Sequence, residues 1–182
     1  LLSLSLYILT AFNKRDPSSA EAALKYFLFG GTAAAVMLFG LSLIYGLSGE
    51  LALSRIAASL RAVPLNPLLV IALIMITAGL AFKVAAAPFH LWAHDAYQGA
   101  PIPSAAFIAS GSKVASFFIL AKIVMLGFDG AEGSGAWRHF QTGWIPLLAV
   151  IAAASIIIGN LVAIVQTSVR RLLAYSAVAH AG

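Results

Sequence analysis

The chain has 182 residues, of which 62% are hydrophobic and only 9% are charged. Soluble domains carry about 25% charged residues, so this chain lacks the polar surface that a soluble globule needs. The net charge of +5 comes from scattered lysines and arginines that lie partly inside apolar runs, which argues against nucleic acid as a partner. Because cysteine is absent, disulfides and cysteine-bound iron–sulfur clusters are excluded. The composition predicts an integral membrane protein.

The apolar runs predict an all-α fold, a polytopic transmembrane helix bundle. A helix needs about 20 apolar residues to cross a bilayer, so we expect about four full spans and two partial ones. In chain order they cover residues 1–12 (partial), 20–47, 67–88 (broken near Pro88), 104–126, 142–166 and 172–182 (partial). Since both end segments are too short to cross, we interpret residues 1–182 as an internal piece of one transmembrane domain.

Residues typical of helix starts mark two of these boundaries. Pro17 cannot continue the first segment, and Ser18 and Glu21 then stand at capping-box spacing. Asn66 and Pro67 are typical of an N-cap followed by a first helical residue. The spans at 20–47 and 67–88 are therefore expected to begin at these signals.

The stretch between the first and second full spans, 20–47 and 67–88, allows two interpretations. Its apolar residues recur at helical spacing, and its arginines lie elsewhere. That pattern is typical of a short helix lying in the membrane interface, and an ordinary polar loop is the alternative. The apolar residues concerned are Leu53, Ile56, Ala57 and Leu60.

Lys83 lies about 16 residues into its span, roughly 24 Å along a helix. A lysine near the end of a span can extend to the membrane surface. However, Pro88 breaks the helix shortly afterwards, and apolar chain, FHLW, follows at similar depth. Ion transporters use broken helices because the break exposes backbone dipoles to a charge. We therefore interpret Lys83 as a functional ionisable group inside the membrane.

Lys113 lies about nine residues into the next span, roughly 14 Å along it and near the bilayer midplane. A lysine at that depth costs about 2.5–3.5 kcal/mol. Ser110 and Ser116 share its helix face, and small residues four apart, Gly111 and Ala115, permit another helix to approach. We expect Lys113 to face protein or trapped water, where it can take up and release a proton.

Three further ionisable side chains lie in or near the spans. Two of them allow two interpretations, and the third allows a simple one. Lys25 follows Glu21 by one turn, which fits either a functional lysine or an ordinary surface ion pair. His180, in the last segment, is either a hydrogen-bonded core residue or a group that titrates near neutrality. Lys122 stands near the end of its span and is expected to reach the surface.

The remaining polar residues give no sign of a metal or cofactor site. His90 and His94 are four apart, as metal ligands on a helix can be, but no third ligand follows and Pro88 disrupts such a helix. Asp95 is expected to cap or pair locally. The sequence contains no nucleophile–base pair, phosphate loop or dinucleotide fingerprint, and so no visible place for NADH, flavin or haem.

Residues 82–123, FKVAAAPFHLWAHDAYQGAPIPSAAFIASGSKVASFFILAKI, resemble the seventh and eighth transmembrane segments of subunit N of respiratory complex I. This subunit of the proton-pumping NADH:quinone oxidoreductase is called subunit 2 in mitochondria and chloroplasts. LYILTAF, EAALKYFLFG and RRLLAYSAVAHAG match in the right order, so the resemblance covers nearly the whole chain. It places the chain at about the fifth to the tenth helix. YQGAP and Lys113 favour subunit N over its antiporter-like paralogues.

The resemblance implies roles for individual residues. Lys83 would be the central proton carrier of the discontinuous seventh helix, and Lys113 would pass protons sideways. Lys25 matches the lysine of the sixth helix, and His180 matches a histidine of the tenth. A fifth-helix glutamate that tunes the seventh-helix lysine would immediately precede Leu1.

One position departs from the family pattern. Where that family usually has proline before the aspartate, this sequence has His94. The departure bears on the geometry that follows the break, and it does not affect the assignment of Lys83.

The resemblance also implies the cofactors and partners. NADH, FMN, iron–sulfur clusters and quinone would lie in other subunits, and this chain would carry no redox centre. It would contact the lipid bilayer and other complex I membrane subunits in a bacterial inner membrane or an equivalent energy-transducing membrane. Two other functions remain open. One is a subunit of a multisubunit cation/proton antiporter, and the other is a structural subunit whose lysines only pair with buried carboxylates.

Overall fold

The computed structural model describes residues 2–62, 66–136 and 138–182. Over these ranges the chain is helical, with one isolated β-bridge between Ser134 and Gln141 as the only strand pairing, so the all-α prediction is confirmed. The helices are α1 Leu2–Thr10, α2 Pro17–Ser48, α3 Leu53–Ala62, α4 Pro67–Val84, α5 Ala93–Gly99, α6 Ile102–Phe107, α7 Lys113–Lys122, α8 Trp144–Ile164 and α9 Val169–Ala181. A π-helical turn, η1 Ile108–Ser112, joins α6 to α7, and a second, η2 Ile123–Gly127, extends α7, so that Ile102–Gly127 is one continuous helix.

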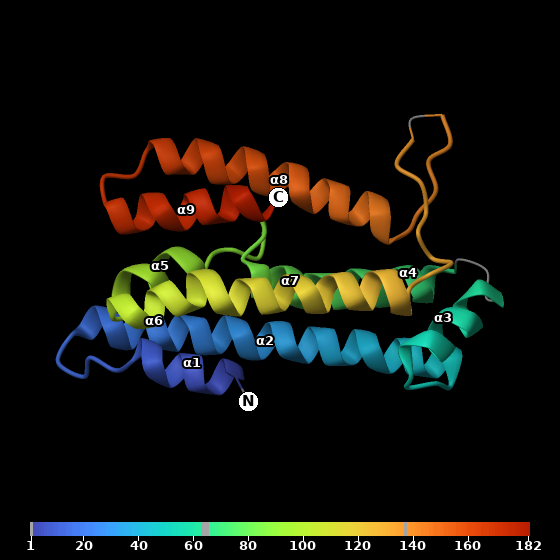
Figure 1. Cartoon of the computed structure of the whole chain (residues 1–182), viewed down its shortest axis with the longest axis horizontal. Helices are drawn as coiled ribbons and strands as arrows, with labels where there is room; N and C mark the ends of the chain where they lie inside the picture. The colour runs from blue at the N-terminus through green and yellow to red at the C-terminus, as the bar shows by residue number, and fades with distance from the viewer. Residues whose placement is uncertain (1, 63–65, 137) are drawn as a thin grey trace.

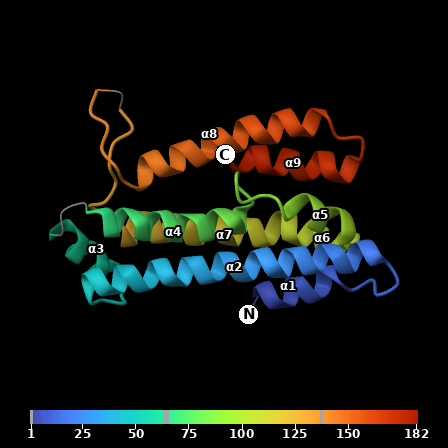
Figure 2. The ribbon, with the colours of Figure 1, turned by 180° about the vertical axis from the view of Figure 1, so that it is seen from behind.

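The helices lie along one another in three layers (Figures 1 and 2). α1 and α2 form one outer layer, α4 to α7 form the middle layer, and α8 and α9 form the other outer layer. α1 and α9 run along only part of the bundle, so the chain ends marked N and C both lie near the middle of its long axis (Figure 1).

Among the described residues, four helices are long and apolar enough to cross a membrane: α2, α4, Ile102–Gly127 and α8. This agrees with the four full spans predicted from the sequence. In the most apolar window of α4, 56% of the residues are buried, against 11–17% for the other three. α4 is therefore the central helix. The outer helices turn apolar side chains such as Leu38 and Phe39 outward, as contact with lipid or further helices requires.

The start of α2 differs from the prediction. Asp16 is the N-cap, because its carboxylate accepts a hydrogen bond of 3.0 Å from the Ser18 N–H, and Pro17 is the first helical residue. Proline is well suited to that position, since its missing N–H would be unpaired there anyway. Ser18 is therefore not the cap. The hydroxyl of Ser19 donates to the Thr10 carbonyl at 2.7 Å and ties α1 to α2.

The start of α4 and the helix α3 follow the sequence signals. The Asn66 side chain accepts from the Leu69 N–H at 2.8 Å, which confirms the predicted cap. The stretch after α2 is a helix and not an ordinary loop, and it buries Ile56, Ala57 and Leu60. On its exposed side, Arg61 pairs with Asp129 in the loop after η2 and holds the pKa of that carboxyl below its usual range.

α2 and α4 approach closely because glycines lie in their contact. A Cβ at Gly79 would stand 2.4 Å from the Cβ of Met37 and 3.0 Å from the Ala33 carbonyl oxygen. A Cβ at Gly40 would stand 2.9 Å from the Ile76 side chain. Only small residues at these positions permit this helix spacing.

Gly79→Ala is therefore expected to destabilise the protein by about 1–3 kcal/mol through overpacking. Gly31→Ala, on α2, is the matched control, because a Cβ there meets nothing within 4 Å. The control is expected to stay within about 0.5 kcal/mol of the parent. Thermal unfolding of the detergent-solubilised full-length protein measures both changes. Equal melting temperatures for the two variants would contradict this packing.

Candidate functional site

The chain leaves helical geometry between α4 and α5, where a discontinuous helix was predicted. The break begins earlier than expected: α4 ends at Val84, and Ala85 takes a left-handed conformation with φ 56°. The Ala85 N–H donates to the Phe82 carbonyl at 3.1 Å and the Ala86 N–H to the Ala81 carbonyl at 2.9 Å. This pair of bonds is the Schellman pattern that ends helices. Pro88 thus follows a helix that has already ended.

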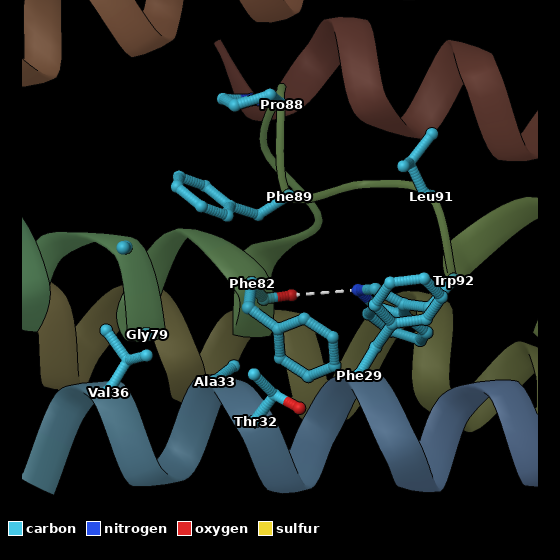
Figure 3. A pocket seen from close by; sticks show the side chains of 11 residues that line it. Phe29, Thr32, Ala33, Val36, Gly79, Phe82, Pro88, Phe89, Leu91 and Trp92 are labelled. Carbon is cyan, nitrogen blue, oxygen red and sulfur yellow. Dashed lines mark hydrogen bonds between the residues drawn. The ribbon is translucent and has the colours of Figure 1, made fainter.

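Backbone groups in the break are bonded inside the protein. The Ala87 N–H donates to the hydroxyl of Ser155 on α8 at 2.8 Å, and Ser155 is fully buried. The indole N–H of Trp92 donates to the Phe82 carbonyl at 3.1 Å (Figure 3). Non-helical backbone at membrane depth requires such internal partners. The break is therefore a built feature of the bundle and not a frayed helix end.

An apolar cavity of about 320 Å³ lies between the break and α2 (Figure 3). Phe82 and Trp92 form part of its wall, and Trp92 stacks on Tyr26 of α2 with ring centroids 4.3 Å apart. None of the described residues that line this cavity is charged. The aromatic rings hold the break against α2, and the cavity offers no polar route for a proton.

Lys83 lies in the last turn of α4, inside the bundle. One turn earlier, Gly79 packs against Ala33 and Met37. Ala33 is roughly 24 Å from the start of α2 and roughly 22 Å from its end. Lys83 therefore lies nearer to the middle of α2 than to either of its ends along the bundle.

The ammonium group of Lys83 has two kinds of stabilising contact. Its Nζ donates to the hydroxyl of Ser3 on α1. It also stands at the C-terminal end of α4, where the helix dipole favours a positive charge. Within the described ranges no carboxylate pairs with it. Its charge is thus held by dipoles, in partly buried surroundings.

Lys113 begins α7, about 17 Å along the helix Ile102–Gly127. Its Nζ donates to the carbonyl of Ala177 on α9 at 2.5 Å. Ser110 and Ser116, expected beside the lysine, donate instead to carbonyls of their own helix at 2.7 and 2.8 Å. The lysine therefore contacts protein, as expected, but its partner comes from another helix.

An open cavity of about 330 Å³ brings Lys113 and His180 together. Water needs only about 10–15 Å³ of such space per molecule, so the cavity can be hydrated. Nδ1 of the exposed His180 lies 2.7 Å from the Ser176 carbonyl. Because a carbonyl only accepts, Nδ1 donates in this contact, and Nε2 is left for other partners.

Lys25 belongs to an ion-pair cluster that joins three helices. Its Nζ lies 2.6 Å from the Glu21 carboxylate, the pair expected from the spacing, and 2.8 Å from the Asp95 carboxylate on α5. The other Asp95 oxygen lies 3.2 Å from the guanidinium of Arg171 on α9. The expectation that Asp95 caps or pairs locally was wrong in this respect, because two of its partners are 70 and 76 residues away. Asp95 holds α2, α5 and α9 together.

The sequence did not reveal that α9 connects the Lys113 site to the ion-pair cluster around Asp95. Arg171 contacts the Asp95 cluster and Ala177 accepts from Lys113, and these residues are about 9 Å apart along the helix. Two features of the sequence could have indicated this connection. The arginine pair at 170–171 opens a helix that contains His180, and Asp95 is a lone carboxylate in an apolar stretch.

All 182 residues match one protein-family model, described as NADH:quinone oxidoreductase/Mrp antiporter, TM. The chain belongs to this family. It is 59% identical over 181 residues to NADH-quinone oxidoreductase subunit N 2 of Acidobacterium capsulatum, covering 100% of this chain and 36% of that protein. The chain thus spans about a third of the length of this curated relative.

Two solved structures of respiratory membrane complexes have a chain with the same fold. Respiratory complex I from Thermus thermophilus matches with 40% identity and a TM-score of 0.78, covering 99% of this chain and 36% of the other. The membrane-bound sulfane sulfur reductase, an archaeal respiratory membrane complex, matches with 32% identity and a TM-score of 0.81, covering 98% and 35%. These findings confirm the resemblance that the sequence suggested.

Proposed function

We propose that this chain is part of a proton-translocating, multi-pass subunit of NADH:quinone oxidoreductase in a bacterial inner membrane. The observation that carries the proposal is Lys83, an ionisable group near mid-depth at the end of a broken helix. Family membership and the 59% identical relative, itself a subunit of an NADH-quinone oxidoreductase, support it. Electron transfer in other subunits would be coupled here to proton movement.

Lys83 would be the central proton carrier. Burial in an apolar bundle penalises its ammonium form, and the end of α4 stabilises that form. A side chain balanced between these effects can gain or lose a proton when nearby hydration or charge changes. The Ser3 hydroxyl can both donate and accept, so it would hydrogen-bond to Lys83 in its charged or its neutral form.

Lys113 and His180 would form the next proton-transfer site. They share one cavity, so water in it can pass a proton between the amine and the imidazole. α9 carries both His180 and the Ala177 carbonyl that holds Lys113. A shift of α9 would therefore change both groups at once.

Lys25 would act at the end of the bundle, where its cluster lines a cavity of about 120 Å³ with Asp95 and Arg171. Competing cations around one carboxylate can exchange partners as protonation changes. Lys25 is thereby suited to pass protons between the exposed end and the interior.

The expected glutamate would complete the Lys83 site. If it immediately precedes Leu1, it is three residues before Ser3 in the sequence, a separation at which residues of one helix share a face. That face meets Lys83. The carboxylate partner that the lysine lacks in the described ranges would then come from the preceding turn.

Other membrane subunits are the proposed partners, and NADH, FMN, iron–sulfur clusters and quinone would be bound outside this chain. The family description also names Mrp antiporters, which keeps a cation/proton antiporter as the alternative. Affinity purification of the tagged full-length protein separates the two. We expect flavin and iron–sulfur absorbance to co-purify with it. Cation/proton exchange without either cofactor would contradict the proposal.

A further inference from the structure

Two histidines flank Tyr175 between α5 and α9, and the proposed function uses neither. The His94 ring stacks on the Tyr175 ring, with centroids 5.4 Å apart and an angle of 16°. The His90 ring meets the same tyrosine edge-on at 6.0 Å. Tyr175 is buried, one helical turn after Arg171. Both imidazoles are thus held in place by one side chain of α9.

One nitrogen of each imidazole is buried without a regular hydrogen bond. Within the described part of the chain, Nδ1 of His90 and Nδ1 of His94 have no partner of ordinary geometry, although the Pro88 carbonyl lies beside the His90 ring. His90 is only 6% exposed. Buried polar atoms are nearly always bonded to protein or to ordered water. Ordered water beside each ring would satisfy these nitrogens.

The other nitrogen of His94 faces the ion-pair cluster. Nε2 lies 3.4 Å from Oδ1 of Asp95, the same oxygen that accepts from Arg171 at 3.2 Å. Lys25 occupies the opposite oxygen, Oδ2, at 2.8 Å. The charged and titratable groups around His94 are therefore His90, Asp95, Arg171, Lys25 and Tyr175.

We propose that His94 transfers protons between Asp95 and the bundle interior, by way of water and His90. The inference deepens the proposed function and rests on it. A proton binds one ring nitrogen while another leaves the opposite nitrogen, so one proton moves and nothing is oxidised or reduced. The ring is then neutral again in its other tautomer, and the starting tautomer is restored when the ring rotates or exchanges its proton through water.

Tyr175, the α9 residue that both histidines contact, gives this path its direction. Tyr175 lies about 6 Å from Arg171 along the helix, and Ala177 lies about 9 Å from it. Arg171 marks the ion-pair cluster, and Ala177 marks the Lys113 site. Tyr175, which both imidazoles contact, therefore lies between the two sites along α9.

Position 94 can be changed without disturbing the backbone. It is the second residue of α5, whose N-cap is Trp92. Proline is tolerated in the first turn of a helix, because its missing N–H has no helical partner there. His94→Pro introduces the proline that the family resemblance implies at this position, and His94→Gln keeps a polar side chain that cannot titrate. His139→Gln, at an exposed loop histidine, is the matched control.

The test measures NADH-driven proton pumping against pH in the purified, reconstituted complex that contains the full-length chain. Histidine titrates near pH 6.5. We expect pumping to change with pH on the acidic side of about pH 6.5 in the parent and in His139→Gln, because burial holds the pKa of His94 below its ordinary value. That change should be lost in both His94 variants. At neutral pH both His94 variants are expected to pump about threefold more slowly, because this route carries its protons through a general acid–base side chain.

A pH profile in the His94 variants that matches the parent would overturn the inference, and so would a uniform loss at every pH. Lys83→Met in the same preparation separates this from the proposed function. If that variant loses pumping while the His94 profiles are unchanged, only the role of His94 fails. If Lys83→Met pumps normally, the proposed function fails and His94 fails with it.

Discussion

Lys113→Met is expected to lower NADH-driven proton pumping by about tenfold or more, because proton-transferring side chains contribute about 10²–10⁴-fold to the steps they carry. The same change is expected to leave the fold intact or to stabilise it. A lysine at the midplane costs about 2.5–3.5 kcal/mol, and methionine removes that cost. Pumping in proteoliposomes and thermal unfolding in detergent measure the two effects.

The contact with Ala177 explains why Lys113→Met is expected to lower activity without lowering stability. The partner of Lys113 is a neutral carbonyl inside α9, not a carboxylate. Such a carbonyl already accepts the N–H four residues later in its helix. Removing the ammonium therefore leaves no unpaired buried charge, which is the usual reason that breaking a buried ion pair destabilises a protein.

Lys113→Arg supplies the matched control. Arginine keeps the positive charge but does not release its proton in proteins. If Lys113 carries protons, the arginine variant is expected to lose pumping as the methionine variant does. If the lysine is only structural, arginine should pump normally per assembled complex, and methionine should reduce assembly. That second pattern would contradict the role proposed here.

The sequence predicted the class of the fold and the broken helix because both depend on local composition. Apolar runs long enough to cross a bilayer predict spans whatever their neighbours are, and four were found. Boundaries depend on finer local chemistry. Asp16, and not Ser18, caps α2. The sequence did not indicate that the break begins at Ala85, because alanine is not typical of a left-handed position.

The partners of the ionisable groups could not be predicted, because they come from distant parts of the chain. Ser3 reaches Lys83 across 80 residues, and Ala177 reaches Lys113 across 64. Spacing along one helix pointed instead to Ser110 and Ser116, which bond their own backbone. Helical periodicity identifies a shared face and does not identify which other helix covers it.

Lys83→Met is expected to have the largest effect. It removes the titratable group near mid-depth at the end of α4, and the Ser3 hydroxyl cannot replace the amine as a proton carrier. NADH-driven pumping should fall about tenfold or more. Insertion and assembly should remain normal, because methionine is apolar and has a good helix propensity.

The most direct measurement is the initial rate of NADH-driven proton translocation in proteoliposomes, normalised to bound flavin. The parent complex, Lys83→Met and Lys122→Met are compared. Lys122 is an exposed lysine at the end of α7 and serves as the control for loss of a positive charge. We predict that Lys122→Met pumps like the parent and that Lys83→Met does not. Equal rates per flavin for all three would contradict the claim that the broken helix presents a proton-carrying lysine.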